Sequence, residues 1–120
     1  MTSPIPLRMA AIGLAHAHVV DMARALAAAG AELVAYHAEA DEASEGDGAG
    51  APAAAFAQAF PQARAVADRR AILEDAGITI VLSASVPDRR AATAIEAMRH
   101  GKDVLVDKPA TTTLAELAEL

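Results

Sequence analysis

The sequence predicts an α/β fold, a three-layer, doubly wound parallel sheet of about five strands with helices on both faces. A helical, alanine-rich run ends at a glycine and is followed by a short apolar run, and this pattern recurs along the chain. The apolar runs are rich in β-branched residues and hardly alternate with polar ones, which is typical of strands buried on both faces. The chain of 120 residues is long enough for one domain.

The elements follow from these runs in chain order. Strands are expected over 9–12, 32–36, 64–66, 78–82 and 103–106, and helices over 21–29, 52–60, 70–76 and 91–100. Glycines 30, 77 and 101 stand where a helix ends, and glycine suits a left-handed C-cap. A last helix begins at residue 114 behind a threonine N-cap. The acidic, glycine-rich stretch 39–50 predicts a surface loop.

Composition excludes several classes of function. The formal net charge of -6 disfavours nucleic acid and acidic membrane surfaces as partners. The absence of cysteine excludes disulfides and thiolate catalysis. Neither a signal peptide nor an apolar stretch of roughly 18 residues is visible, so we expect a cytoplasmic protein without a membrane partner.

The turn after the first strand is the first candidate site, because ligands of open parallel sheets bind at the carboxyl ends of the strands. A dinucleotide fingerprint has glycine at three places in this turn. Gly13 fills the first place, whereas Ala15 and His18 stand at the other two. The motif is weak, but its context of strand, turn and helix is right. Backbone N–H groups at the helix start could hold a phosphate.

The histidines of this turn also suggest a metal site. His16 and His18 form a His-X-His pair, and only His37 and His100 remain as further histidines. No carboxylate lies close by in the sequence, and metal sites need three or four convergent ligands. His100, beside Gly101, is better explained by the negative end of a helix dipole. We therefore expect no metal.

Glu39, after the second strand, stands near the position where dinucleotide domains place a carboxylate for the adenosine ribose. No basic residue is close to it in sequence, and the acidic loop that follows would repel a 2′-phosphate. If a dinucleotide binds, these features favour NAD over NADP. The alternative is that Glu39 is a solvated loop residue.

Two further segments are expected at the same edge. After strand 78–82, the serines could hydrogen-bond a ribose or nicotinamide, Asp88 could cap the next helix, and Arg89 and Arg90 could meet phosphate, although arginines at a helix start usually face water. After strand 103–106, Lys108 would place a cation where a hydride or proton is transferred, unless it is a plain surface lysine.

Together these segments resemble the NAD(P)-binding, Rossmann-type N-terminal domain of the Gfo/Idh/MocA oxidoreductases, over about residues 8–120. The most specific passage is 97–109, which reads AMRHGKDVLVDKP and is similar to the family pattern A-L-x-x-G-K-H-V-x-x-E-K-P. The block 78–90 and the Gly13 turn also match.

The resemblance implies roles for individual residues. Lys108 would lie beside the nicotinamide and the substrate as the catalytic lysine, with Asp107 in the glutamate position and Pro109 matching directly. Ser85 and Pro87 align with the T-P-N motif near the nicotinamide, whose asparagine is missing here. The turn residues that would meet the pyrophosphate are Gly13, Leu14, Ala15 and His16.

The resemblance also implies a missing part. Family members continue into a second domain that carries the substrate pocket, so we expect residues 1–120 to be a cofactor-binding domain that is not catalytic alone. Its substrate would be a sugar, a polyol or a related hydroxyl or carbonyl compound.

Two alternatives remain open. One is a stand-alone nucleotide- or CoA-binding module without redox chemistry. The other is a folded remnant without a tight ligand, which could self-associate as a homo-oligomer through an edge strand and through Leu114, Leu117 and Leu120.

Overall fold

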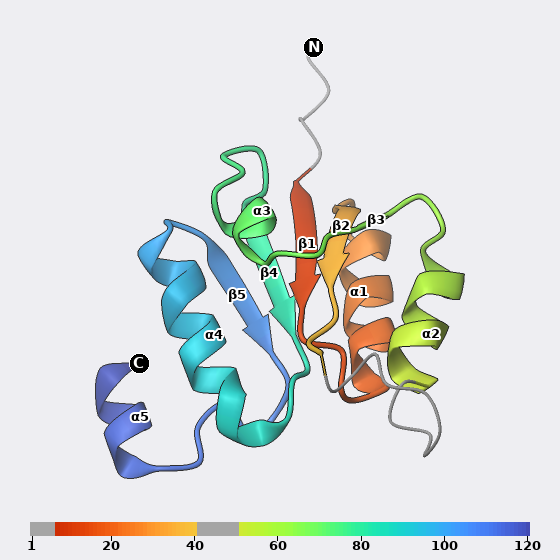
Figure 1. Cartoon of the computed structure of the whole chain (residues 1–120). Coiled ribbons are helices and arrows are strands. Elements are labelled where there is room, and N and C mark those ends of the chain that lie inside the picture. Colours follow the sequence, from red (N-terminus) through yellow and green to blue (C-terminus); the bar gives the residue numbers. More distant parts are fainter. Residues whose placement is uncertain (1–6, 41–50) are drawn as a thin grey trace.

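The computed structural model describes residues 7–40 and 51–120 and confirms the predicted α/β fold (Figure 1). Most of the loop expected over 39–50 lies outside the described residues. The elements are β1 (Arg8–Ile12), α1 (His18–Ala28), β2 (Glu32–His37), α2 (Ala51–Ala59), β3 (Arg64–Ala65), α3 (Arg70–Leu73), β4 (Ile80–Ser83), α4 (Pro87–Arg99), β5 (Asp103–Val106) and α5 (Leu114–Glu119).

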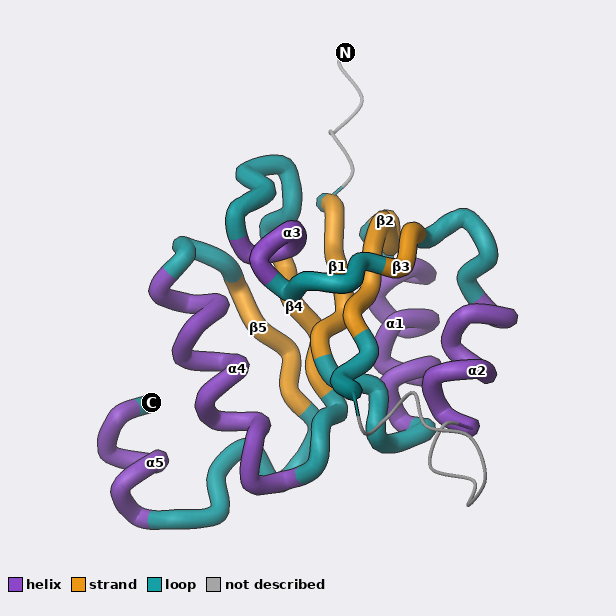
Figure 2. The backbone as a smooth tube through the Cα atoms, viewed as in Figure 1, coloured by secondary structure: helices purple, strands orange, loops and turns teal. Residues whose placement is uncertain are grey.

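The strands form one parallel sheet in the order β3-β2-β1-β4-β5. The chain leaves β1 toward β2 and β3 and then returns to β4 on the other side of β1 (Figure 2). Strand order therefore reverses at β1, and this is where a doubly wound sheet binds ligands, at the carboxyl ends of the strands.

Side chains of β1 alternate between two hydrophobic cores. Met9 and Ala11 pack with Phe56 in the core beneath α1 and α2. Ala10 and Ile12 pack in the core beneath α3 and α4 on the opposite face. All of these residues are fully buried, so β1 has no solvent-exposed face after Arg8. This burial explains why its sequence is almost uniformly apolar.

Two of the three predicted glycine caps are confirmed. Gly30 and Gly101 have φ angles of +110° and +78°, and each follows the end of a helix. The prediction for Gly77 is wrong, because its φ is not positive. Here α3 ends at Leu73, and the Gly77 N–H donates instead to the Asp75 carboxylate over 2.8 Å.

A buried lysine binds the turn between α3 and β4. Lys102 is only 6% exposed, and its ammonium donates to the carbonyl oxygens of Asp75 and Ile78 over 2.7 and 2.6 Å. These carbonyls point at the lysine instead of joining a helix or strand. The segment between Leu73 and Ile80 is consequently a turn, although the sequence predicts a helix and a strand that meet at Gly77.

The last helix, α5, has the predicted threonine cap. The Thr113 hydroxyl accepts the N–H of Glu116, and the Glu116 carboxylate accepts the N–H of Thr113. Its leucines at 114, 117 and 120 are exposed. None of the helices in the described part of the chain has the length and apolar character needed to cross a membrane.

Candidate functional site

The candidate site lies at the carboxyl edge of the sheet, where the segments that follow β1, β4 and β5 meet. Because β4 pairs with both β1 and β5, the ends of these three strands are neighbours. The Asp107 N–H donates to the Ser83 carbonyl over 2.9 Å, and the Ala84 N–H donates to the Gly13 carbonyl over 3.0 Å. Three segments that the sequence predicts as functional are thus joined through their backbones.

Gly13 occupies a position that only glycine fits. Its φ is +89°, and a Cβ added there would overlap the Ser85 hydroxyl oxygen and lie 2.9 Å from the Ser85 Cβ. Its N–H donates to the His37 carbonyl at the end of β2 over 3.0 Å. The glycine turn is therefore packed directly between β2 and β4.

The start of α1 offers N–H groups to an anion. The N–H of His16 donates to the Ala84 carbonyl over 3.1 Å, and the N–H of His18 donates to the His16 imidazole over 3.1 Å. Within the described chain, the N–H groups of Ala15 and Ala17 make no hydrogen bond, and the N-cap residue Ala17 has no side-chain cap. The positive end of the helix dipole and these N–H groups form a natural place for a phosphate.

Two buried serines at the end of β4 and just after it pack against the Gly13 turn. Ser83 and Ser85 are 1% and 0% exposed, and their hydroxyl oxygens lie 2.9 Å apart. The Ser85 side chain thus packs directly against Gly13. Pro87, the other predicted contact, is exposed as the first residue of α4. Asp88 lies within the first turn of α4 and does not cap it, because the N-cap is Val86.

Arg90 has a role in the site that the sequence did not predict. The sequence suggests that Arg90 either meets a phosphate or faces water, but Arg90 is only 3% exposed. It donates to the carbonyl oxygens of Ser85 over 2.7 Å and of Lys108 over 2.6 Å, and its Nη2 lies 3.6 Å from the Asp107 carboxylate. The missed signal was helical spacing, since Arg90 lies four residues before the buried Ala94.

Arg90 thereby holds the segment that carries Lys108. The Asp107 side chain is 10% exposed, and its Oδ1 accepts the Lys108 N–H over 2.9 Å. The Lys108 side chain is exposed, and in residues 7–40 and 51–120 its ammonium has neither a hydrogen bond nor an ion pair. The Lys108–Pro109 peptide bond is cis. An ordered backbone thus presents an available cation at the sheet edge.

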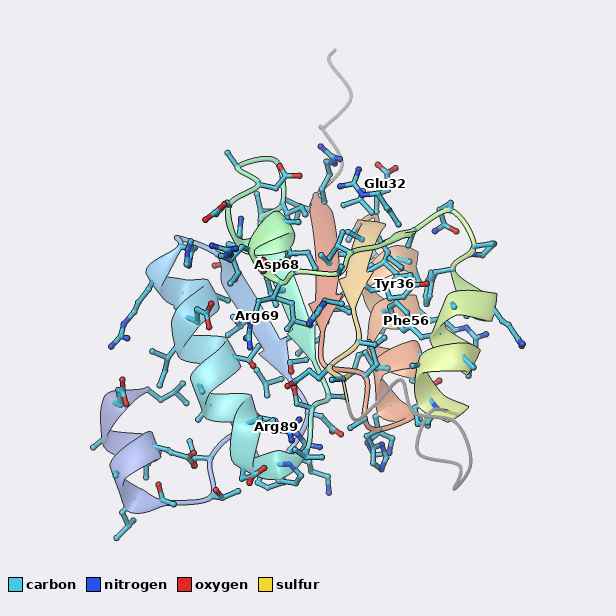
Figure 3. All side chains as sticks on the ribbon, viewed as in Figure 1. Glu32, Tyr36, Phe56, Asp68, Arg69 and Arg89 are labelled. Atoms are coloured by element: carbon cyan, nitrogen blue, oxygen red, sulfur yellow. The ribbon has the colours of Figure 1, made fainter. Side chains whose placement is uncertain are left out.

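Glu39 and Arg89 form an ion pair across the sheet edge. Arg89 Nη1 donates to Glu39 Oε2 over 3.2 Å, and the Glu39 side chain is 16% exposed. Arg89 is at the start of α4 (Figure 3). The sequence shows no basic residue near Glu39, because Arg89 is 50 positions away along the chain. In the folded chain the two residues are neighbours, so Glu39 does have a basic residue beside it.

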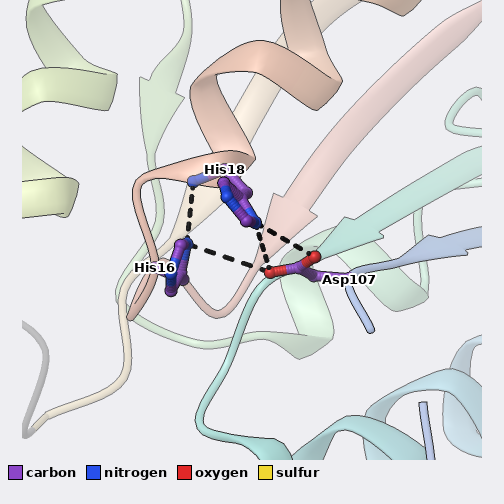
Figure 4. Close-up of side chains that lie close together, drawn as sticks. All are labelled: His16, His18 and Asp107. Atoms are coloured by element: carbon purple, nitrogen blue, oxygen red, sulfur yellow. Dashed lines mark hydrogen bonds and ion pairs between the residues drawn. The ribbon is translucent and has the colours of Figure 1, made fainter. Parts of the chain in front are cut away.

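Three side chains at this edge lie close together (Figure 4). The His18 Nδ1 lies 3.1 Å from Asp107 Oδ2, and the His16 Nδ1 lies 3.9 Å from the same oxygen. The sequence gives no sign that Asp107 lies beside the His-X-His pair, since 89 residues separate His18 from Asp107.

Two surface hollows lie between pairs of helices. One of about 370 Å³ lies between α4 and α5 and is lined in part by Ile95, Arg99 and Glu116. Another of about 510 Å³ lies between α1 and α2 and is lined in part by Val20 and Gln58. Ala17 at the start of α1 lines the second hollow, whereas Gly13, Glu39 and Lys108 line neither.

The fold, with its glycine turn after the first strand, is of the nucleotide-binding α/β class. The model of the "oxidoreductase family, NAD-binding Rossmann fold" matches residues 8–120. The chain belongs to this family, the Gfo/Idh/MocA oxidoreductases, and corresponds to its NAD-binding domain. A search of curated proteins gave no significant match.

Solved structures of similar fold include several oxidoreductases. A protein assigned as an oxidoreductase from Erwinia carotovora atroseptica SCRI1043 is 35% identical over 93% of this chain and 31% of its own, with a TM-score of 0.80. The myo-inositol dehydrogenase of Lactobacillus casei is 24% identical over 95% of this chain and 32% of its own, with a TM-score of 0.73.

Biliverdin reductase from Synechocystis sp. PCC 6803 is 24% identical over 93% of this chain and 32% of its own, with a TM-score of 0.69. The chain thus spans about a third of the length of each of these three structures.

Proposed function

We propose that this chain binds a nicotinamide dinucleotide at the carboxyl edge of its sheet, as the cofactor-binding part of an oxidoreductase. One observation carries the proposal. The turn at Gly13, the N–H groups at the start of α1 and the Lys108 segment are joined at one edge by backbone hydrogen bonds and by Arg90. A CoA- or nucleotide-binding module needs the first two features but has no evident need for the third.

Each part of the dinucleotide has a proposed partner. The pyrophosphate would lie at the turn from Gly13 to His16, with the Ala15 N–H as a donor. The adenosine ribose would bind Glu39, and the nicotinamide would lie beside Lys108. Ser85 would act indirectly, by supporting Gly13 from below, because its side chain is fully buried. Pro87 and Pro109, which are both exposed, would lie at the nicotinamide end.

NAD is the proposed cofactor ahead of NADP. The Glu39 carboxylate can accept hydrogen bonds from the ribose hydroxyls of NAD, and it would repel the 2′-phosphate of NADP. Arg89 could instead attract that phosphate, but its guanidinium is already paired with Glu39 over 3.2 Å. Cofactor preference is therefore set by the balance of this pair.

The substrate class rests on the family alone. We propose a sugar, a polyol or a related hydroxyl or carbonyl compound, bound mainly by residues outside these 120. Structures of this fold hold different molecules, since one contains myo-inositol and another contains biliverdin. Lys108 would supply the cation on the cofactor side of that pocket and is the proposed catalytic residue of this chain.

Calorimetric titration of the chain with NAD, NADH, NADP and CoA tests the binding proposal. We expect saturable binding of NAD and NADH at one site. The variant Lys108→Ala should lower the affinity for NADH relative to NAD by about threefold, because a nearby ammonium repels the positive ring of NAD but not the neutral ring of NADH. Arg99→Ala is the matched control, since it removes a cation at the carboxyl end of α4, where it pairs with Glu119. Binding of CoA alone would favour the non-redox module, and no binding at all would overturn the proposal.

The cofactor preference has its own test. Glu39→Gln removes the repulsive charge, so we expect the ratio of NAD to NADP affinity to fall by roughly tenfold, equivalent to about 1.4 kcal/mol. Arg89→Ala in the Glu39→Gln background should restore most of the preference. Glu119→Gln, which also loses an ion pair with an arginine, is the control. An unchanged ratio in Glu39→Gln would remove Glu39 from the cofactor site.

A further inference from the structure

We propose that His16, His18 and Asp107 form a binding site for a divalent transition-metal ion, with Zn²⁺ as the preferred ion. The two imidazoles and the carboxylate each offer one ligand atom, and these atoms all lie within 4.8 Å of one another. The sequence predicts no metal, because no carboxylate lies near the histidines along the chain. The fold supplies that carboxylate from the end of β5 (Figure 4).

The spacing of the atoms is close to that of a zinc site. Tetrahedral zinc with ligand bonds of about 2.0–2.1 Å has ligand atoms about 3.3 Å apart. The His18 Nδ1 and Asp107 Oδ2 are 3.1 Å apart, and the His16 Nδ1 is 3.9 Å from the same oxygen. The side chains of His16 and His18 are 50% and 52% exposed, so their rings can turn toward an ion without disturbing the core.

The carboxylate is fixed in place, whereas the histidines are adjustable. Asp107 Oδ1 accepts the Lys108 N–H over 2.9 Å, and Arg90 Nη2 lies 3.6 Å from Oδ2. The positive charge of Arg90 opposes a cation, but its guanidinium also donates to the backbone carbonyls of Ser85 and Lys108. Hydrogen bonds that orient a ligating carboxylate raise the precision of a metal site.

Binding changes one hydrogen bond in the protein. The His16 Nδ1 accepts the backbone N–H of His18 over 3.1 Å, so coordination through Nδ1 replaces this contact. If the ring turns to present Nε2, the contact is also lost. We therefore expect a weaker site than that of a structural zinc protein, whose ligands are already free to coordinate.

The donor set also indicates the kind of site. Two histidines and one carboxylate are the ligands of several catalytic zinc centres, in which the fourth position is left to water or to an oxygen of a bound molecule. Here that position would be available to an anionic oxygen of a ligand at the start of α1. The metal proposal does not depend on cofactor binding, because the ligand atoms all come from this chain.

The test is metal titration of the full chain after treatment with EDTA and removal of the chelator, at neutral pH and without nucleotide. Calorimetry with ZnCl₂ should show one equivalent bound, and Co²⁺ should give the visible absorption bands of a four- or five-coordinate site. His16→Ala, His18→Ala and Asp107→Asn should each weaken Zn²⁺ binding by at least tenfold, the lower end of the effect seen when even a supporting group is lost.

His100→Gln is the matched control, since His100 is an exposed histidine bonded to the Glu96 carbonyl. It should retain full affinity. Chemical denaturation of each variant shows whether the fold is intact, so that lost binding is not confused with unfolding. If Asp107→Asn binds Zn²⁺ as tightly as the parent, the ion is held by the surface histidine pair alone and the proposed site is wrong. Absence of Zn²⁺ binding by the folded parent would overturn it as well.

Discussion

The two ends of the sheet each contain a buried cation that donates to backbone carbonyls, but the carbonyls belong to one turn at one end and to the candidate site at the other. At the amino end, Lys102 binds the Asp75 and Ile78 carbonyls and closes the turn that leads into β4. At the carboxyl end, Arg90 binds the Ser85 and Lys108 carbonyls and also pairs with the Asp107 carboxylate.

The difference in chemistry matches the difference in task. A lysine ammonium on its flexible side chain can donate hydrogen bonds to two carbonyls of a single turn. A guanidinium presents donors in a planar fork, so Arg90 can hold two segments in a fixed relation, the end of β4 and the Lys108 segment. Burial of a cation therefore serves stability alone at one end, and at the other end it also sets the position of a candidate site.

The glycines repeat this contrast. Gly13 at the carboxyl end and Gly30 before β2 at the amino end both have positive φ angles, +89° and +110°. A Cβ at Gly30 would meet nothing within 4 Å, whereas one at Gly13 would overlap Ser85. A tight turn alone requires glycine at the amino end, while close packing of the candidate site adds a second requirement at the carboxyl end.

The largest expected effects come from replacing each of the two buried cations with an apolar side chain. Arg90→Met should lower the free energy of unfolding by about 3–5 kcal/mol, because it leaves buried carbonyls and the Asp107 carboxylate without their partner. Lys102→Met leaves only carbonyls unpaired and should cost about 1–3 kcal/mol. Urea denaturation followed by circular dichroism measures both values.

The cofactor separates the two variants further. At a urea-free condition where both are folded, Arg90→Met should lose NADH affinity, since the Lys108 segment is no longer held, and Lys102→Met should keep it. Equal affinity in the two variants would show that Arg90 has only a structural role.

Substitution of the two glycines is the next test in size. Gly13→Ala combines backbone strain with overpacking against Ser85, and we expect a loss of about 2–4 kcal/mol. Gly30→Ala has the strain alone and should lose about 1 kcal/mol. Ser85→Gly in the Gly13→Ala background removes both overlapping atoms and should recover part of the loss, which a double-mutant cycle quantifies. No coupling between the two positions would contradict the packing described for this turn.

The sequence predicted the parts of this molecule that depend on local pattern. Alanine-rich helices, apolar strands, the Thr113 cap and the caps at Gly30 and Gly101 are confirmed because each depends on neighbouring residues. The Gly77 cap fails because a distant lysine, Lys102, takes the carbonyls of that turn.

The candidate site was predicted only in part for the same reason. The positions of Gly13, Glu39 and Lys108 follow from their places after strands, so sequence spacing could find them. The partners of these residues could not be found in this way, since Arg89 reaches Glu39 across 50 positions and Asp107 reaches His18 across 89. Such contacts depend on the order of strands in the sheet, which single-sequence patterns leave open.

The smallest expected effect is that of acid on Glu116, and it tests whether Arg90 or the following helix α5 holds the Lys108 segment. Glu116 accepts hydrogen bonds from the Thr112 N–H, the Thr112 hydroxyl and the Thr113 N–H, and the bond from the Thr112 backbone is the main cause of the lowered pKa of this carboxylate. A carboxylate with a lowered pKa stabilises the folded state above its unfolded pKa, here near the ordinary value of 4.5. This stabilisation is lost as the pH falls through the lower pKa of the folded state.

Acidification below pH 4.5 should therefore loosen the start of α5 while Arg90 still holds Lys108. Amide NMR signals of Thr112 and Thr113 should move toward unstructured values over this range. In Glu116→Gln the side-chain oxygen still accepts the same hydrogen bonds, so the Thr112 signal should stop titrating with this group. If Glu116→Gln changes the pH response of the signals at 107–108 as much as that of the signals at 112–113, the Lys108 segment is held by α5, and the role assigned to Arg90 at the carboxyl end is wrong.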